Sequence, residues 1–80
     1  MISAMILVGE HCQKCNMLKT MLGENAMYVK FEKAEDNMDF CRKHNIRQVP
    51  AMYCYPRMSE EPKIIYDLEE IVNEVERRIK

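Results

Sequence analysis

Two cysteines separated by two residues, Cys12 and Cys15, stand in the segment 9–17, GEHCQKCNM. A pair at this spacing can cycle between dithiol and disulfide, hold a metal ion together with other ligands, or form a permanent cross-link. A redox pair needs one accessible and ionisable thiol, whereas a metal site needs further ligands close by. The elements that position the pair therefore distinguish these possibilities.

The pair falls where a short apolar run gives way to a helical pattern. Residues 3–8, SAMILV, are suited to a buried strand, which Gly9 ends. From about Cys12 onward apolar residues recur at helical spacing as far as Leu22, and Gly23 stands where a C-terminal cap would. The first turn of a helix presents unpaired N–H groups and the positive end of the helix dipole. We therefore expect Cys12 to ionise more easily than a free cysteine, whose pKa is about 8.5.

The two thiols are expected to have different roles. Cys15 lies three residues beyond Cys12, on nearly the same helix face and within reach to close a disulfide. It shares the apolar face with Leu18 and Leu22, so it should be the more buried of the two. In a redox cycle, the exposed Cys12 would attack a substrate disulfide and Cys15 would resolve the mixed disulfide.

Charged neighbours act on the pair in opposing directions. Lys14 and a protonated His11 favour the thiolate, whereas Glu10 opposes it, and the net effect is expected to lower the pKa of Cys12. His11 flanks the nucleophile and should be exposed, so it either contacts substrate or is a plain loop residue. We count His11 and Lys14 among the expected substrate-binding residues.

A second motif lies in residues 44–50, HNIRQVP, where Pro50 opens a predicted strand. Proline has no N–H group, so it removes one hydrogen bond from the sheet at this point. If the Val49–Pro50 peptide bond is cis, the N–H and C=O of Val49 turn outward and can pair with an extended substrate. The cis state is a minority for X–Pro bonds, about 5–6% in folded proteins, so position alone leaves both isomers open.

The remaining elements are predicted from apolar periodicity and helix caps. They are a strand at 27–32, a short helix from Asp36 or Asn37 to about His44, strands at 51–55 and 63–66 joined by the loop 56–62, and a helix beginning at Asp67. The order β-α-β-α-β-β-α predicts a parallel first pair and an antiparallel hairpin at the end. We therefore expect one α/β domain, residues 1–80, with a four-stranded mixed sheet flanked by three helices on both faces. The methionines at strand and helix positions are interpreted as core residues.

Together these motifs resemble the thioredoxin-like superfamily. The segment ILVGEHCQKCNM is similar to its strand-to-helix redox motif, and KHNIRQVPAMYCY, residues 43–55, resembles the stretch that leads through a cis-proline into the central antiparallel strand. The likeness spans essentially the whole chain, whose length fits glutaredoxins and the smallest thioredoxin-like proteins. It implies a thioredoxin fold of glutaredoxin size and thiol–disulfide oxidoreductase activity. The implied nucleophile is Cys12, the resolving thiol is Cys15, and Pro50 is the substrate-facing cis-proline.

The chain departs from glutaredoxins where those proteins bind glutathione. The Gly-Gly pair after the fourth strand is absent, since residues 64–67 read IIYD, and no lysine precedes the cysteine pair. The resemblance implies no bound cofactor, with electrons supplied by an external thiol or a reductase. Glutathione is one candidate donor, but the motifs do not support its recognition. The expected substrates are protein or small-molecule disulfides.

A zinc-binding module is the main alternative. Cys12 and Cys15 are followed, 25 residues later, by Cys41-x2-His44, which has zinc-ligand chemistry and plausible spacing. We favour the redox interpretation because Cys41 and His44 fall on a separate predicted helix. In that interpretation Cys41 and Cys54 are small core residues and His44 ends a helix. A further possibility is a thioredoxin-like domain that only binds a partner and has no catalytic activity.

Composition narrows the range of partners. With 48% apolar residues and charges of both signs interspersed, the chain is typical of a folded protein. The net charge of −1, without a cluster of lysines and arginines, argues against nucleic-acid and membrane partners. The apolar run at 4–8 is far shorter than the ~20 residues of a membrane span. Because the N-terminal stretch has neither a positive residue nor a signal-peptide cleavage site, we expect the protein in the reducing cytoplasm. We also expect it to be a monomer.

Overall fold

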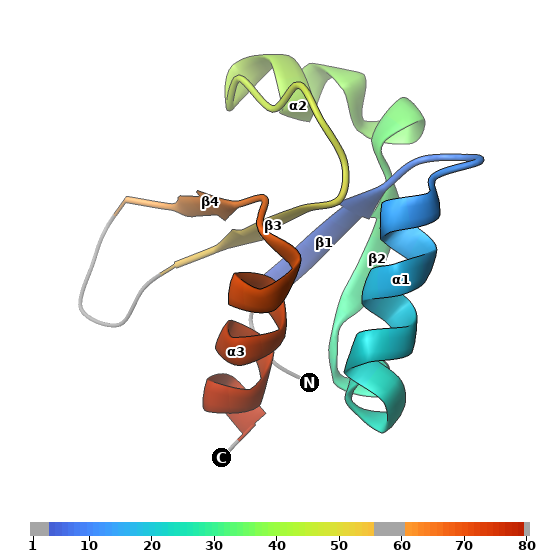
Figure 1. The fold of residues 1–80 in the computed structure, drawn as a ribbon. Helices are drawn as coiled ribbons and strands as arrows, with labels where there is room; N and C mark the ends of the chain where they lie inside the picture. The colour runs from blue at the N-terminus through green and yellow to red at the C-terminus, as the bar shows by residue number, and fades with distance from the viewer. Residues whose placement is uncertain (1–3, 56–60, 80) are drawn as a thin grey trace.

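The computed structural model describes residues 4–55 and 61–79 (Figure 1). The elements lie in the predicted order β-α-β-α-β-β-α, with two short 3₁₀ helices, η1 and η2, added. Ser3 of the first predicted strand and residues 56–60 of the predicted loop lie outside the described residues. The elements are β1 (Ala4–Val8), α1 (Gln13–Leu22), η1 (Gly23–Tyr28), β2 (Lys30–Lys33), η2 (Ala34–Asn37), α2 (Met38–Lys43), β3 (Ala51–Cys54), β4 (Lys63–Ile65) and α3 (Leu68–Ile79).

The four strands form one mixed sheet in the order β2-β1-β3-β4. Strand β1 pairs with β2 in parallel, with Ile6 opposite Phe31. It pairs with β3 in antiparallel fashion, with Ile6 opposite Met52. Strands β3 and β4 are antiparallel, with Met52 opposite Ile65. The predicted parallel first pair and final antiparallel pair are both confirmed.

Helices cover both faces of the sheet, as predicted. Successive side chains of a strand point to opposite faces, so Ile6 and Val8 of β1 face one way and Leu7 faces the other. Ile6 and Val8 pack with residues of α1 and α3 in the larger apolar cluster. Leu7 packs in a smaller cluster with Ile46 and Ala51, against which residues of α2 lie. Figure 1 shows α1 and α3 on one side of the sheet and α2 on the other.

The second strand begins three residues later than predicted. The chain leaves α1 at Gly23, whose φ of 57° lies in the left-handed region that glycine adopts without strain. It then forms η1, closed by a hydrogen bond from the N–H of Val29 to the carbonyl of Ala26. Met27 therefore lies in η1, 73% exposed, while Val29 is buried as predicted. An alternating pattern cannot distinguish the first residues of a strand from a turn with local hydrogen bonds.

The prediction that the methionines fill the core is wrong for four of those that the structure describes. Met52 in β3 is fully buried and Met5 in β1 is partly buried, but the four others are exposed. A long, unbranched side chain is tolerated equally in a core and on a helix surface, so its presence does not indicate burial. The exposed methionines are Met17, Met21, Met27 and Met38.

Helix α2 occupies its predicted span, between a cap at Asn37 and His44, and η2 directly precedes it. Asn37 stands in the cap position, but its side-chain amide donates to the carbonyl of Lys33 (2.8 Å) instead of capping α2. The predicted cap of α3 is confirmed, since a carboxylate oxygen of Asp67 accepts from the N–H of Glu70 at 3.1 Å. None of the helices in residues 4–55 and 61–79 is long and apolar enough to cross a membrane.

Candidate active site

The turn between β1 and α1 places the Cys12 sulfur at the start of the helix. Cys12 immediately precedes α1 with an extended backbone, and its Sγ accepts a hydrogen bond from the N–H of Cys15 at 3.1 Å. His11, the residue before it, has a φ of 53°. The first turn of α1 contains no acidic residue that would repel an anion. The sulfur thus occupies the N-cap position of the helix, which the sequence predicts.

Cys12 and Cys15 form a disulfide, with their Cα atoms 5.2 Å apart. Their surroundings differ in the predicted sense. Cys15 is only 2% exposed and packs in the larger apolar cluster, whereas Cys12 is partly exposed and lies at the edge of that cluster. When the pair is reduced, an incoming group therefore meets Cys12 first.

The surroundings of the Cys12 sulfur favour its charged form. A hydrogen bond donated to a thiolate and the positive end of a helix dipole both lower the pKa of a thiol. The N–H of Cys15 and the N-terminus of α1 supply these two effects at Cys12. The arrangement can therefore generate a nucleophilic sulfur beside a second thiol that can displace whatever the first one binds.

The loop that ends in Pro50 meets this turn in space. The Val49–Pro50 peptide bond is cis, and the carbonyl oxygen of Val49 lies 4.0 Å from Cys12 Sγ. Val49 is partly exposed, whereas Pro50 is buried. The structure thus brings four predicted site residues together: Cys12, Cys15, Val49 and Pro50.

Gly9 permits the close approach of these two segments. A Cβ atom at this position would lie 3.1 Å from Cγ2 of Val49, closer than ordinary van der Waals contact. In the sequence, Gly9 indicates only the end of a strand. The contact joins residues forty positions apart, so no local pattern in the sequence could have indicated it.

His11 and Lys14 lie on either side of the nucleophile in the sequence, and both side chains are exposed. Within residues 4–55 and 61–79 neither side chain forms a hydrogen bond or an ion pair. Both can therefore turn toward a molecule that approaches Cys12. A contact with substrate stays a prediction for each of them.

The residues of the zinc alternative do not come together. Cys41 lies on α2 and packs against the smaller apolar cluster, on the sheet face opposite to Cys15. His44 forms the C-cap of α2, with its ring centroid 4.5 Å from that of Phe40 and 4.8 Å from that of Tyr53. Among the described residues, no three potential metal-binding side chains form a group.

Cys54 is the second unpaired cysteine besides Cys41, and it lies in the core, as predicted. It pairs across the sheet with Ala4, at the end of β1 away from the Cys12 turn. Burial raises the pKa of the Cys54 thiol, and the positive charge of Arg78 offsets part of that effect. A buried thiol with a raised pKa is unreactive, so Cys54 belongs to the packing of the core.

No protein-family model and no curated protein matches the chain. Among solved structures, it is similar to one described as a malarial protein, with 14% identity over 99% of this chain and 98% of that chain and a TM-score of 0.61. It is also similar to the J-Trx1 fragment of ERdj5, with 14% identity and a TM-score of 0.64. That match covers 99% of this chain and 44% of the fragment. At this identity the likeness shows a shared fold alone.

Proposed function

Because the chain has a thioredoxin-like fold and carries a cysteine pair at the start of α1, we propose that it is a thiol–disulfide oxidoreductase. The observation that supports the proposal most is the position of the Cys12 sulfur. It accepts the Cys15 N–H at the helix N-terminus and lies at bonding distance from the Cys15 sulfur. A structural cross-link would require neither partial exposure of Cys12 nor the Val49 carbonyl beside its sulfur.

The steps of the proposed reaction follow from the exposure of the two thiols, because a substrate reaches Cys12 before the buried Cys15. The Cys12 thiolate attacks one sulfur of a substrate disulfide, forms a mixed disulfide and displaces the other substrate sulfur as a thiolate. Cys15 loses its proton and attacks the Cys12 sulfur, which releases the second substrate thiolate. The substrate has gained two electrons, and the pair ends as the Cys12–Cys15 disulfide. An external thiol or a reductase then returns two electrons to the pair.

Substrate docking in the proposed reaction uses the edge beside Pro50. The carbonyl of Val49 lies 4.0 Å from the Cys12 sulfur, so an extended segment that pairs with the Val49 backbone brings its own cysteine to Cys12. The exposed side chains of His11 and Lys14 flank the same approach. We place them in contact with substrate rather than in the chemical step.

The proposed substrates are protein or small-molecule disulfides, and the protein acts as a monomer without a built-in cofactor. The proposed reducing role suits the cytoplasm, where external thiols and reductases keep cysteines reduced. Residues 64–67 occupy the region where glutaredoxins carry a Gly-Gly pair, so we favour a reductase or a general dithiol over glutathione as the donor.

Reduction of a protein disulfide by dithiothreitol tests the proposal. The purified protein should accelerate this reduction, and Cys12→Ser should abolish the acceleration because the attacking sulfur is gone. Cys15→Ser should accumulate mixed disulfides, which mass spectrometry detects. Cys54→Ala, which removes a free thiol at the far end of the sheet, serves as the matched control and should keep the activity. Full activity of the Cys12→Ser variant would contradict the proposal.

A further inference from the structure

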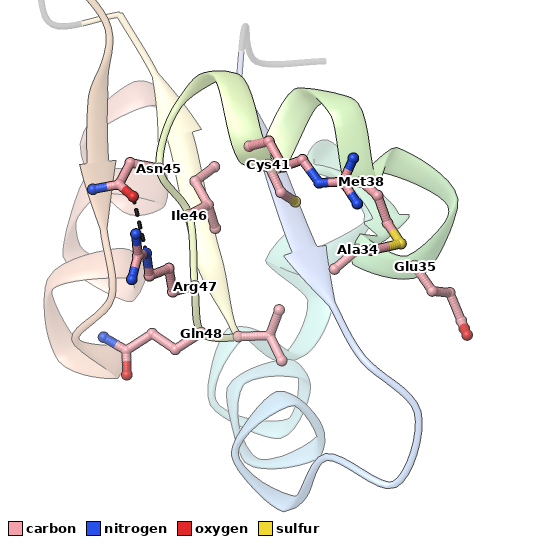
Figure 2. A pocket seen from close by; sticks show the side chains of 10 residues that line it. Ala34, Glu35, Met38, Cys41, Asn45, Ile46, Arg47 and Gln48 are labelled. Carbon is pink, nitrogen blue, oxygen red and sulfur yellow. Dashed lines mark hydrogen bonds between the residues drawn. The ribbon is translucent and has the colours of Figure 1, made fainter.

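A groove of about 570 Å³ begins beside the active site and runs between the η2–α2 segment and the loop that leads to Pro50 (Figure 2). Side chains from both segments line it. Its apolar lining comes from Ala34, Met38, Cys41, Ile46 and Val49. A volume of this size can hold one or two large side chains.

Val49 connects the groove to the reactive sulfur. It lines the groove, and its carbonyl oxygen lies 4.0 Å from Cys12 Sγ. The residues that flank a substrate cysteine at Cys12 are therefore within reach of the groove. Side chains of these flanking residues can enter the groove while the disulfide is attacked.

A positive charge stands at one side of the groove. Asn45 holds Arg47 in place, since Nε of Arg47 donates to its Oδ1 at 3.0 Å (Figure 2). Within residues 4–55 and 61–79 Arg47 forms no ion pair, whereas Arg42, which also lines the groove, lies 3.9 Å from Asp39. Glu35 comes from η2, across the groove from Arg47. The guanidinium of Arg47 is thus available to an anion.

We propose that the groove selects protein disulfides whose reactive cysteine is flanked by an apolar side chain and a carboxylate. The apolar side chain packs against Met38 and Val49, and the carboxylate pairs with Arg47. This inference rests on the proposed function and names its substrate class. Glutathione has no apolar side chain next to its cysteine, so it cannot fill the apolar part of the groove. The preferred substrate is therefore a protein segment.

Three short peptides, each as a disulfide-linked dimer with blocked ends, test the proposal. Their sequences are Glu-Leu-Cys-Leu-Glu, Gln-Leu-Cys-Leu-Gln and Glu-Gly-Cys-Gly-Glu, so either chain direction presents the same groups. We expect kcat/KM for the first peptide to exceed that for the glutamine peptide by up to about fivefold, the size of an exposed ion pair. It should exceed that for the glycine peptide by at least about tenfold, since a leucine side chain is buried.

Two variants should each remove one preference. Arg47→Gln should abolish the preference for glutamate over glutamine and keep that for leucine over glycine. Met38→Gln, at an exposed position of the groove, should reduce the preference for leucine and keep that for glutamate. Arg77→Gln makes the same charge change on α3, on the other face of the sheet, and should keep both preferences.

Bis(2-hydroxyethyl) disulfide, which cannot fill the groove, separates the two proposals. If the wild type reduces it but reduces all three peptides at equal rates, the groove proposal is overturned while the proposed function stands. Faster reduction of glutathione disulfide than of the leucine–glutamate peptide would also overturn it, because it would indicate a glutathione site. If neither bis(2-hydroxyethyl) disulfide nor any of the three peptides is reduced, the proposed function fails and the groove proposal with it.

A binding measurement complements the rates. In the Cys15→Ser variant, the leucine–glutamate peptide can be trapped on Cys12 as a mixed disulfide. The trapped peptide should slow the alkylation of Cys41 by N-ethylmaleimide, because Cys41 lines the groove. A hydroxyethyl group trapped in the same way should leave that rate unchanged. Equal alkylation rates for the two adducts would place the peptide outside the groove.

Discussion

At the scale of single residues, the Cys12 sulfur combines a hydrogen bond with the end of a helix. It accepts the N–H of Cys15 at 3.1 Å, directly before the first residue of α1. Both effects stabilise a negative charge more than a neutral thiol. The reactivity of the proposed enzyme therefore depends on the backbone of α1 as much as on charged side chains.

We predict that the Cys12 thiol of the reduced protein titrates below about 8.5, the pKa of a free cysteine. The absorbance of the thiolate at 240 nm, followed against pH, measures this value. Cys12→Ser is the blank that removes the contribution of Cys12 while the other thiols stay. A titration of Cys12 at or above the ordinary value would show that the helix end does not activate it.

Gly9 offers a second prediction at this scale. A methyl group there would stand 3.1 Å from Cγ2 of Val49, so Gly9→Ala should push the Val49 loop away from the Cys12 turn. We expect a loss of about 1 kcal/mol in the free energy of unfolding, typical of slight overpacking. We also expect Gly9→Ala to raise the KM for protein disulfides more than the KM for small disulfides. Urea unfolding and steady-state kinetics measure the two effects.

The double variant Gly9→Ala with Val49→Ala is the control for that interpretation. Removing Cγ2 of Val49 removes the atom that the new methyl group would contact. The loss caused by Gly9→Ala should therefore be smaller in the Val49→Ala background than in the wild type. Additive losses would mean that Gly9 matters for another reason, such as the flexibility of the turn.

At the scale of elements, the end of α2 determines how the groove is built. The N–H of Ile46 donates to the carbonyl of Cys41 at 2.8 Å, and that of Asn45 to the carbonyl of Arg42 at 3.2 Å. These two bonds, with Asn45 at a φ of 57°, form a Schellman motif. The motif turns the chain so that Ile46 packs inward while Arg47 stays exposed.

Substitutions of Asn45 can separate its backbone role from its side-chain role. Asn45→Ala should cost about 1–2 kcal/mol in the free energy of unfolding, because alanine disfavours a left-handed backbone. Asn45→Gly should preserve stability, since glycine adopts this backbone freely. Both variants lose the hydrogen bond to Arg47. Thermal unfolding measures the difference, and equal stabilities of the two variants would contradict the assigned backbone role.

At the scale of the whole molecule, the stability of the fold should depend on pH through Cys54. Burial raises the pKa of its thiol above the ordinary value of a cysteine, about 8.5. Above that value the unfolded chain releases the proton while the folded protein still holds it, so stability falls as pH rises toward the folded pKa. The stabilisation that the neutral thiol provides is fully present below the pKa of the unfolded chain and is lost as the pH rises through the folded pKa.

We predict that, as the pH rises above about 8.5, the free energy of unfolding falls more steeply in the wild type than in Cys54→Ala. The other titrating groups are shared by both proteins, so the difference between the two curves isolates Cys54. Urea titrations of the reduced proteins at several pH values provide the curves. Parallel curves would show that the Cys54 thiol ionises as readily in the folded protein as in the unfolded one.

The sequence predicts the parts of this molecule that depend on local pattern. Apolar periodicity indicates the elements, and the right-handed crossover rule then determines how β1 and β2 pair. The cap at Asp67 and the glycine at the end of α1 were likewise predictable, because each acts within four residues. The position of Cys12 follows from these elements, since it lies at a junction between two of them.

The parts that could not be predicted depend on contacts distant in the sequence. The approach of Val49 to Gly9 and the groove beside it exist only once two loops meet. The isomer of the Val49–Pro50 bond was left open by its position and indicated only by the family resemblance. By contrast, Asn45 followed by the apolar Ile46 is a local signal for the end of α2 that was not among the predictions, although it can be read from the sequence.

The burial of Cys15 has a consequence for the redox equilibrium of the cysteine pair. This sulfur belongs to the reactive pair and, at 2% exposure, to the apolar interior around Leu18. Packing around Cys15 can stabilise the disulfide form of the folded protein more than the dithiol form, or the reverse. By thermodynamic linkage, the same difference in free energy appears in the reduction potential of the pair. A conservative change at Leu18 could therefore retune the driving force of electron transfer, while every charge on the surface stays as it is.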